Sequence, residues 1–235
     1  MQRQTIAVLK FGGTSLATRA QREIAATRVR EARDGGFATV AVVSAFGRAP
    51  EPYATDSLLG LAANGAPGAN TDLLLAAGEL IAASVFATEL SEAGVEAVAL
   101  SGARAGIITD DRHGDASILR VEPQAVCEIL ARGAVAVVAG FQGATPDGTI
   151  TTLGRGGTDL SAIAIGHALD AQRVDIYTDV SGVMTADPRR VEQARTITHV
   201  SLAEMSELAD HGAGIMHDKA AAYADRTATR YALKG

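Results

Sequence analysis

Cysteine is nearly absent from the sequence, and so is any segment that could act as a secretion signal or a membrane span. Cys127 is the only cysteine among 235 residues, so no internal disulfide can form, as is usual in reducing compartments. Only five apolar-leaning residues precede Lys10, too few for a signal peptide. No apolar run reaches the roughly 18 residues that a bilayer span needs. We therefore expect a cytoplasmic protein without a membrane partner.

An excess of basic residues is also missing. The chain has 21 Lys and Arg against 27 Asp and Glu, and the net charge of −6 argues against a nucleic-acid-binding surface. Hydrophobic residues make up 47% and charged residues 20%, an ordinary balance for a globular protein. The length is enough for a large core, and we expect one domain that spans residues 1–235.

Common nucleotide and metal motifs are absent as well. There is no Gly-Lys-Ser/Thr of a P-loop, and no Gly-x-Gly-x-x-Gly follows a predicted strand. His211 and His217 are not spaced like a zinc pair, and the other three histidines stand alone. We expect no metal held by protein side chains alone.

What is present is an alternation of strands and helices. The strands are predicted at 5–9, 38–45, 95–100, 134–139 and 173–178, and the runs 38–45 and 134–139 are continuously apolar, as in parallel strands covered on both faces. Helices are predicted at 15–33 with Ile24 and Val29 facing inward, at 71–93 with Thr71 as cap, and at 123–132, 202–210 and 217–231. The pattern predicts an α/β fold, a three-layer αβα sandwich with a mainly parallel central sheet. In such folds ligands bind beyond the carboxyl ends of the strands.

A glycine-rich stretch at 151–164 precedes another apolar helical run. Gly154, Gly156 and Gly157 bracket Arg155. The first N–H groups of a helix lack internal partners, and the helix dipole adds positive charge there, so this turn predicts an anion site. Arg155 adds donors that fit a carboxylate or phosphate. The alternative is a plain turn with a solvated arginine.

Two charged residues accompany the predicted sheet and its long helix. Lys10 ends the first strand beside Gly12 and Gly13, where a lysine can stabilise a transferring phosphoryl group. Glu79 lies in an apolar part of the helix at 71–93, where an unpartnered carboxylate would be costly. A lysine that merely marks the strand edge and a glutamate on the polar side of the helix are the alternatives.

Several motifs together resemble aspartate kinases of the amino acid kinase family. They are Lys-Phe-Gly-Gly-Thr-Ser at 10–15, Leu-Leu-x-x-Gly-Glu at 74–79, Ala-Gly-Phe-Gln-Gly at 139–143, Leu-Gly-Arg-Gly-Gly-Thr-Asp at 153–159 and the stretch 176–189. The resemblance runs from Lys10 to about Tyr223. It implies a kinase that transfers the γ-phosphoryl group of ATP to the side-chain carboxylate of L-aspartate, with Mg²⁺ held largely by phosphates and water.

The resemblance implies roles for individual residues. Lys10 would bridge the phosphoryl group and the acceptor, with Asp159 orienting it. Arg155 would bind the α-carboxylate of aspartate and Glu79 its ammonium, within an amino-acid site made of Ser44, Glu79, Phe141, Arg155, Gly156 and Thr158. ATP would be bound by Lys10, Gly12, Gly13, Thr14, Thr178, Asp179, Met184, Arg189 and Lys219.

The nucleotide side departs from the family pattern. Ser181 replaces a usual aspartate, Met184 replaces a common tyrosine, and Gly214 replaces a usual lysine. The run from Gly212 to Lys219 is similar to a stretch in glutamate 5-kinase and acetylglutamate kinase, whose lysine faces the ATP phosphates. We expect Lys219 to supply the missing charge, with a solvated helix lysine as the alternative.

These departures keep two other functions open. One is a family member that phosphorylates another small carboxylate, a carbamate or a phosphonate. The other is a non-catalytic sensor or partner subunit with the same fold.

The resemblance also carries expectations about regulation and assembly. Aspartate kinases commonly bear C-terminal ACT domains that bind lysine or threonine, whereas only Ala232–Gly235 follow the last predicted helix, too few residues for such a domain and for a final strand. We expect no regulatory domain, no response to lysine or threonine, and a homodimer formed through the catalytic domain.

Overall fold

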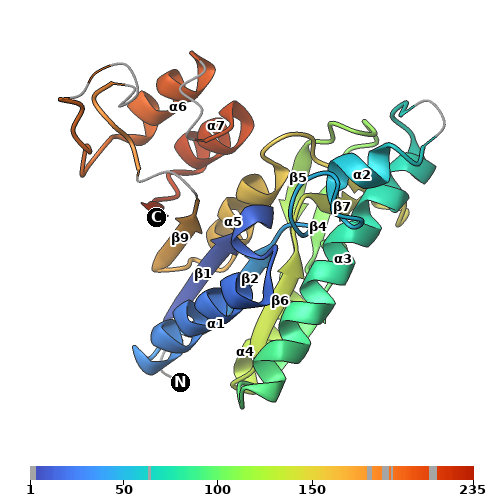
Figure 1. Cartoon of the computed structure of the whole chain (residues 1–235), viewed down its shortest axis with the longest axis horizontal. Coiled ribbons are helices and arrows are strands. Elements are labelled where there is room, and N and C mark those ends of the chain that lie inside the picture. Colours follow the sequence, from blue (N-terminus) through green and yellow to red (C-terminus); the bar gives the residue numbers. More distant parts are fainter. Residues whose placement is uncertain (1–3, 63–64, 179–181, 187–190, 192, 212–215) are drawn as a thin grey trace.

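The computed structural model describes residues 4–62, 65–178, 182–186, 191, 193–211 and 216–235 (Figure 1). A six-stranded sheet lies at its centre, in the order β10-β9-β1-β2-β6-β3, and every neighbouring pair is parallel. The strands are β1 (Ile6–Phe11), β2 (Ala38–Val43), β3 (Ala97–Leu100), β6 (Val135–Ala139), β9 (Arg173–Tyr177) and β10 (Ala232–Lys234). The two continuously apolar runs form β2 and β6 at the middle of the sheet, buried on both faces as predicted.

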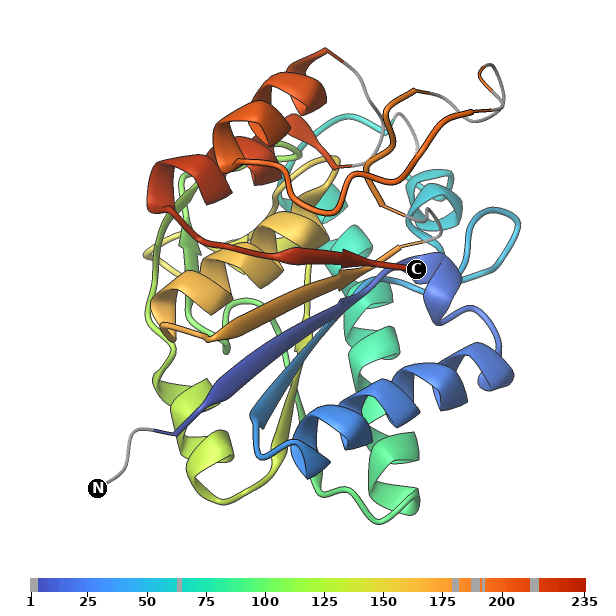
Figure 2. The same cartoon turned by 90° about the vertical axis from the view of Figure 1, so that its left-hand side faces the viewer.

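Helices cover both faces of this sheet (Figure 2). One layer holds α1 (Arg19–Asp34) and α3 (Ala69–Glu92), and the other holds α4 (Gln124–Ala131) and α5 (Gly157–Ala168). Phe86 of α3 and Val29 of α1 are fully buried in the first apolar cluster, and Ile129 and Ile165 are buried in the second. The predicted three-layer αβα sandwich with a parallel sheet is confirmed.

The C-terminal helices extend the second layer. α6 (Leu202–Asp210) and α7 (Asp218–Thr227) pack together, and α7 packs on α5 (Figure 1). Met205, Met216 and Ala220 join Ile163 of α5 in a third buried cluster. The chain then returns to the sheet, where Ala232–Lys234 forms the edge strand β10 beside β9. The expectation that these last residues are too few for a strand was therefore wrong, because parallel pairing with β9 supplies the hydrogen bonds that a three-residue segment lacks alone.

A second, smaller sheet was not predicted. It contains β4 (Ile107–Thr109), β5 (Ile118–Val121), β7 (Gln142–Ala144) and β8 (Ile150–Thr152), in the order β5-β4-β7-β8. Its pairs β4–β5 and β7–β8 are antiparallel, and β4–β7 is parallel. The short helix α2 (Thr55–Leu59) packs on α3 near this sheet. Because β8 contacts α3, the small sheet holds the glycine-rich stretch that follows β8 close to that helix.

Details of α1 and α3 correct the sequence prediction. α1 begins at Arg19 rather than Ser15, since Thr18 and Gln21 form a reciprocal capping box. Ile24 is 62% exposed instead of inward, because the helix packs through Val29 and three alanines on another side. Thr71 is not the cap of α3, which begins earlier. Gly68 occupies the cap position, and the Thr71 hydroxyl donates to the Ala66 carbonyl.

The helix α3 is long and apolar enough to cross a membrane by length and composition, contrary to the sequence-based expectation. Half of its most apolar window is nevertheless buried inside the protein. It also carries Asp72 and Glu79, whose carboxylates are buried and hydrogen-bonded to other segments. These contacts identify α3 as a core helix.

Candidate active site

The carboxyl ends of the central strands meet at one edge of the sheet. Phe11 of β1 lies opposite Val43 of β2 and Tyr177 of β9, and Val43 lies opposite Ala139 of β6. A cleft of 540 Å³ opens there. It is lined by most of the predicted site residues, namely Lys10, Gly12, Gly13, Thr14, Ser44, Glu79, Phe141, Arg155, Gly156, Thr158, Asp159 and Thr178. Segments more than 160 residues apart in the sequence thus meet in one cleft.

Lys10 and Asp159 form an ion pair at the floor of this cleft. The Lys10 ammonium lies 2.6 Å from the Asp159 carboxylate, and both side chains are largely buried. Lys10 is the fifth residue of β1, and Asp159 lies in the first turn of α5, so the pair joins the sheet to the helix. A Cβ atom on Gly12 would lie 3.5 Å from the Lys10 ammonium, so this turn passes directly beside the charge.

The N-terminus of α5 faces the cleft, as the glycine pattern predicts. Gly156 is the N-cap residue with φ of +70°, a left-handed conformation that favours glycine. The N–H of Gly157 donates to the Gly154 carbonyl over 3.0 Å. Gly156 has no side chain that could cap the helix, so the N–H groups of the next residues, Thr158 and Asp159, are the backbone donors offered to a ligand in the cleft. Arg155 is exposed at the mouth of the cleft, directly before the cap. The turn therefore offers both backbone donors and a guanidinium to an anion.

Glu79 is a buried acid on the opposite side of the cleft. Its side chain is 2% exposed and accepts a hydrogen bond of 2.9 Å from the backbone N–H of Ala45, directly after β2. Burial raises the pKa of Glu79 well above its usual value, although the Ala45 N–H and the charge of Lys10 act in the other direction. A buried acid that lines a cleft is suited to bind a cationic group of a ligand.

Hydroxyl groups and an aromatic ring complete this side of the cleft. Ser44 donates to the Thr158 hydroxyl over 2.9 Å, which links the end of β2 to α5. Phe141 has φ of +65°, and its N–H donates to Ser161, whose hydroxyl donates in turn to the Gly157 carbonyl. The sequence analysis missed Ser161, because its position in an apolar helical run resembles any core serine.

Tyr177 is a second residue that the sequence analysis missed. It lines the cleft and stacks on Phe11 with ring centroids 5.0 Å apart. Its place at the end of β9, directly before Thr178, could have identified it, since the neighbouring strand ends carry the other site residues.

The predicted nucleotide residues are only partly brought together. Thr178 lines the cleft, whereas Met184 and Lys219 do not. Met184 forms an isolated bridge with Thr196, and Lys219 forms an ion pair with Asp115 and donates to the Leu153 carbonyl over 3.4 Å. Asp179 and Arg189 lie outside the described residues, as do Ser181 and Gly214.

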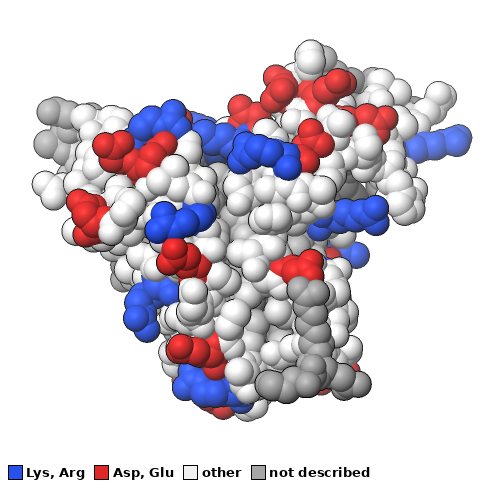
Figure 3. All heavy atoms as spheres, turned by 180° about the vertical axis from the view of Figure 1, so that it is seen from behind, with Lys and Arg blue, Asp and Glu red and all other residues white. Residues whose placement is uncertain are grey.

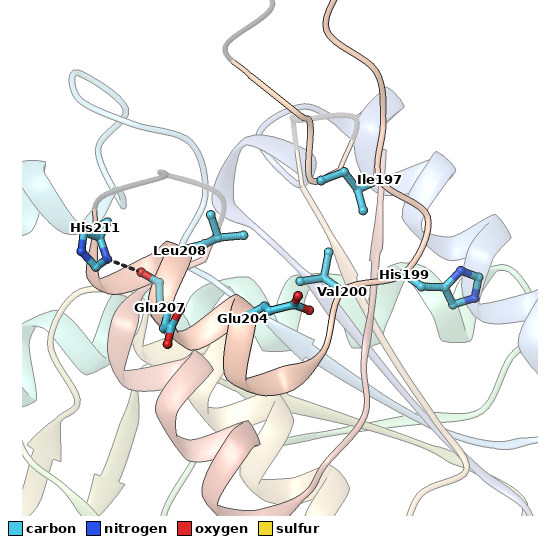
Figure 4. A pocket seen from close by; sticks show the side chains of 7 residues that line it. All are labelled: Ile197, His199, Val200, Glu204, Glu207, Leu208 and His211. Atoms are coloured by element: carbon cyan, nitrogen blue, oxygen red, sulfur yellow. Dashed lines mark hydrogen bonds between the residues drawn. The ribbon is translucent and has the colours of Figure 1, made fainter.

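A second hollow of 370 Å³ lies over α6, away from the predicted site (Figure 4). Seven residues line it, namely Ile197, His199, Val200, Glu204, Glu207, Leu208 and His211. Glu204 accepts from Ser201 in the capping box of α6, and His211 contacts the Glu207 carbonyl. Two of its polar groups therefore serve the helix itself, and the cleft at the sheet edge remains the candidate active site.

On the face of the molecule opposite to that in Figure 1, the charged side chains of one sign do not form a single patch. On that face, Lys and Arg side chains are interspersed with Asp and Glu side chains (Figure 3). In the cleft, by contrast, four charged residues line one space, namely Lys10, Glu79, Arg155 and Asp159.

Comparisons with known proteins agree with this site. A model of the amino acid kinase family matches residues 5–232. Aspartokinase 1 of Bacillus subtilis (strain 168) is 48% identical over 218 residues, which are 92% of this chain and 54% of that protein. The chain thus spans about half the length of the curated relatives it matches.

Solved structures give the same answer. The aspartate kinase from Synechocystis superposes with a TM-score of 0.82 at 37% identity, covering 98% of this chain and 38% of that chain. Aspartokinase III of E. coli in complex with aspartate and ADP superposes with a TM-score of 0.79 at 31% identity, covering 94% and 60%. The resemblance to aspartate kinases is confirmed, and by its matched residues, its fold and its cleft the chain belongs to the amino acid kinase family.

Proposed function

We propose that this chain is the catalytic part of an aspartate kinase, which transfers the γ-phosphoryl group of ATP to the side-chain carboxylate of L-aspartate. The observation that carries the proposal is the cleft in which the Lys10–Asp159 pair, the uncapped N-terminus of α5 and the buried Glu79 meet. It is supported by the similarity to aspartokinase III, whose structure was solved with aspartate and ADP.

The charges of the cleft fit the two ends of an amino acid. Arg155 and the α5 N–H groups suit an α-carboxylate, and Glu79 suits an α-ammonium. Ser44 and Thr158 line the same cleft and hydrogen-bond to each other. We propose that the amino acid is held at both charged ends, with its side chain directed toward Lys10. Holding both reactants in one geometry lowers the barrier without a covalent enzyme intermediate.

Lys10 is the residue proposed to act on the reacting phosphoryl group. Its ammonium is desolvated and held by Asp159, so it is oriented before the reaction begins. Charge that develops on the transferred oxygens is stabilised by such a fixed cation. The product is an acyl phosphate, 4-phospho-L-aspartate.

The turn after β1, which contains Gly12, Gly13 and Thr14, is proposed to bind the ATP phosphates together with Thr178. A Cβ atom on Gly13 would lie 2.4 Å from the Ala45 carbonyl, so only glycine lets the backbone pass this close to the loop after β2. Among the described residues, no group of three or more His, Cys, Asp or Glu could hold a metal ion. Mg²⁺ is therefore proposed to be held mainly by the phosphates and water, and when bound it neutralises phosphate charge.

Hydroxylamine trapping of acyl phosphates tests this function. Purified protein with ATP, Mg²⁺ and L-aspartate should yield aspartyl hydroxamate. The same protein with glutamate, acetate or carbamate in place of aspartate should yield no trapped product. Product from another acceptor alone would favour a relative with a different substrate. Tight binding of aspartate without product would favour the non-catalytic sensor.

We also propose that the protein is a cytoplasmic homodimer that pairs through α3. Leu73 and Leu80 are 56% and 37% exposed on the outer side of this helix, and Ala77, Ser84 and Thr88 extend the same uncharged side. A helix that is apolar all round is normally buried, and a second copy of the same surface would cover it. Light scattering should find a dimer, and Leu73→Lys with Leu80→Lys should give a monomer.

The proposed cytoplasmic location is supported by the single cysteine.

A further inference from the structure

Asp72 is a fully buried carboxylate that the function described so far does not use. It lies in the first turn of α3, and its side chain has no solvent exposure. Its oxygens accept hydrogen bonds from the Thr152 hydroxyl (2.7 Å), the Thr152 N–H (3.0 Å), the Gly114 N–H (3.1 Å) and Nδ1 of His113 (2.7 Å). One acid thus holds two segments that are 41 to 80 residues away in the sequence.

Both of these segments support the glycine turn of the active site. Thr152 comes two residues before Gly154, where the turn begins. Gly114 lines the cleft, and its carbonyl would be 3.2 Å from a Cβ atom on Gly154. Asp115 is closer still, with a carboxylate oxygen 2.5 Å from that position. The loop that Asp72 anchors therefore packs directly against the turn that carries Arg155.

The same side of α3 carries the other half of the amino-acid site. Glu79 follows Asp72 by seven residues, about two helical turns, so both carboxylates point to one side of the helix. Between them, the Ala76 carbonyl accepts a hydrogen bond of 3.0 Å from the buried side chain of Gln142 in β7. One rigid helix thus bears the acid suited to the ammonium and also anchors the turn suited to the carboxylate.

We infer that Asp72 is a positioning residue that sets the spacing between the ammonium-binding Glu79 and the carboxylate-binding turn at Arg155. This inference rests on the proposed function of the cleft as an amino-acid site. Asp72 itself does not line the cleft and acts only through Thr152 and the loop at Gly114.

The chemistry of the carboxylate explains why an acid is needed here. All four groups around Asp72 donate, and a carboxylate offers only acceptor sites. Asparagine has the same shape, but its NH₂ group would face N–H and O–H donors and leave some of them without an acceptor. Asp72→Asn is therefore a change of hydrogen bonding at constant volume.

Kinetics of the Asp72→Asn variant test the inference. The KM for aspartate should rise about 10-fold or more, because a small displacement of the turn at Arg155 relative to Glu79 would prevent both groups from binding the substrate at once. The value of kcat should change less than about threefold, since Lys10 and the turn at Gly13 have no contact with Asp72. The KM for ATP should rise less than the KM for aspartate, because only Lys219, through its ion pair with Asp115, links the loop at Gly114 to the proposed phosphate site. Thr152→Val and His113→Ala remove one donor each and should give smaller increases in the KM for aspartate. They also decide the question if Asp72→Asn does not fold.

Asp175→Asn is the matched control. Asp175 is a buried acid of β9 that accepts a hydrogen bond from Arg173, and it does not line the cleft. The KM for aspartate of this variant should stay at the wild-type value.

Amide hydrogen exchange separates this inference from the proposed function. Exchange in residues 153–157 should be faster in Asp72→Asn than in wild type and unchanged in Asp175→Asn, whether or not the protein phosphorylates aspartate. A wild-type protein without activity would reject the proposed function alone. A folded Asp72→Asn variant with wild-type exchange in this turn, or with equal increases in both KM values, would overturn the positioning role.

Discussion

The ammonium of Lys10 and the carboxylate of Asp159 lie 2.6 Å apart, although 149 residues separate them in the sequence. The pair is largely shielded from solvent, so both the position and the orientation of the Lys10 ammonium group are fixed. A cation held in this way needs no reorganisation when charge develops on a transferred phosphoryl group.

Lys10→Ala should therefore lower kcat by at least about 100- to 1,000-fold, with little change in aspartate binding. Steady-state hydroxamate assays measure kcat, and calorimetric titration measures binding. Arg132→Ala is the control. Arg132 is exposed at the end of α4, just before the start of β6, and therefore lies near the amino ends of the strands, away from the cleft at their carboxyl ends. Near-normal turnover of Lys10→Ala would remove Lys10 from the reaction.

Glu79→Ala and Arg155→Ala should each raise the KM for aspartate. Loss of the buried Glu79 would leave the substrate ammonium unpaired, at a cost of about 2–5 kcal/mol. Arg155 is exposed in the free protein, and its charged hydrogen bonds to the substrate should contribute about 1.5–3 kcal/mol. Glu128→Ala on the exposed surface of α4 is the control for Glu79. If aspartate KM stays unchanged in both variants, the amino-acid site lies elsewhere.

The buried Glu79 also predicts a pH dependence of stability. Because burial raises its pKa in the folded protein, the folded state keeps a proton that the unfolded state has lost. Stability should therefore fall as pH rises from the ordinary value of 4.5 to the raised value, and it should be unaffected by this group below 4.5.

Glu79→Gln should remove that decline, since glutamine keeps an acceptor for the Ala45 N–H without a charge. Thermal unfolding of both proteins between about pH 4 and 8 should show the variant gaining in relative stability with increasing pH. Parallel melting curves across this range would contradict a raised pKa.

The sequence predicted the central sheet because its strands are continuous apolar runs, as at 38–45 and 134–139. The motifs that resemble aspartate kinases named most of the residues that line the cleft, and these residues meet because Lys10, Ser44 and Thr178 lie at or next to strand ends on one edge of the sheet. The small sheet escaped prediction because its strands have only three or four residues and include buried polar side chains such as Thr109 and Thr151.

Asp72 could not have been recognised from sequence. An acid in the first turn of a helix is explained by the helix dipole alone, and nothing in the chain indicates that it is buried. Its partners lie on a loop and a strand that are close only in the folded protein. Lys219 is a similar case, since its ion-pair partner Asp115 is 104 residues away.

Gly156→Ala should impair both stability and aspartate binding. The residue has φ of +70°, and an added Cβ atom would lie 2.2 Å from Cβ of His217. Gly133→Ala is the matched control, because Gly133 has φ of +77° with no atom within 4 Å of an added Cβ. The control should lose only about 1–2 kcal/mol from backbone strain. Gly156→Ala should lose more and also raise the KM for aspartate. Equal losses in the two variants would mean that the contact with His217 relaxes freely.

Lys219 remains predicted to serve the ATP phosphates, although its ammonium is paired with Asp115 in the described structure. The two side chains are 30% and 65% exposed, so the pair should contribute no more than about 1 kcal/mol, and phosphates could compete for the lysine. Lys219→Ala should therefore raise the KM for ATP or lower kcat.

Asp115→Ala distinguishes a direct role of Lys219 from a structural one. This change releases the ammonium from its carboxylate partner, so the KM for ATP should stay the same or fall if Lys219 reaches the phosphates. If the lysine only supports the loop beside Gly154, both single variants should weaken ATP binding equally, and the double variant should be no worse than either. Measured KM values for ATP in the two single variants and the double variant decide between these outcomes, and equal losses would assign Lys219 to the support of the glycine turn.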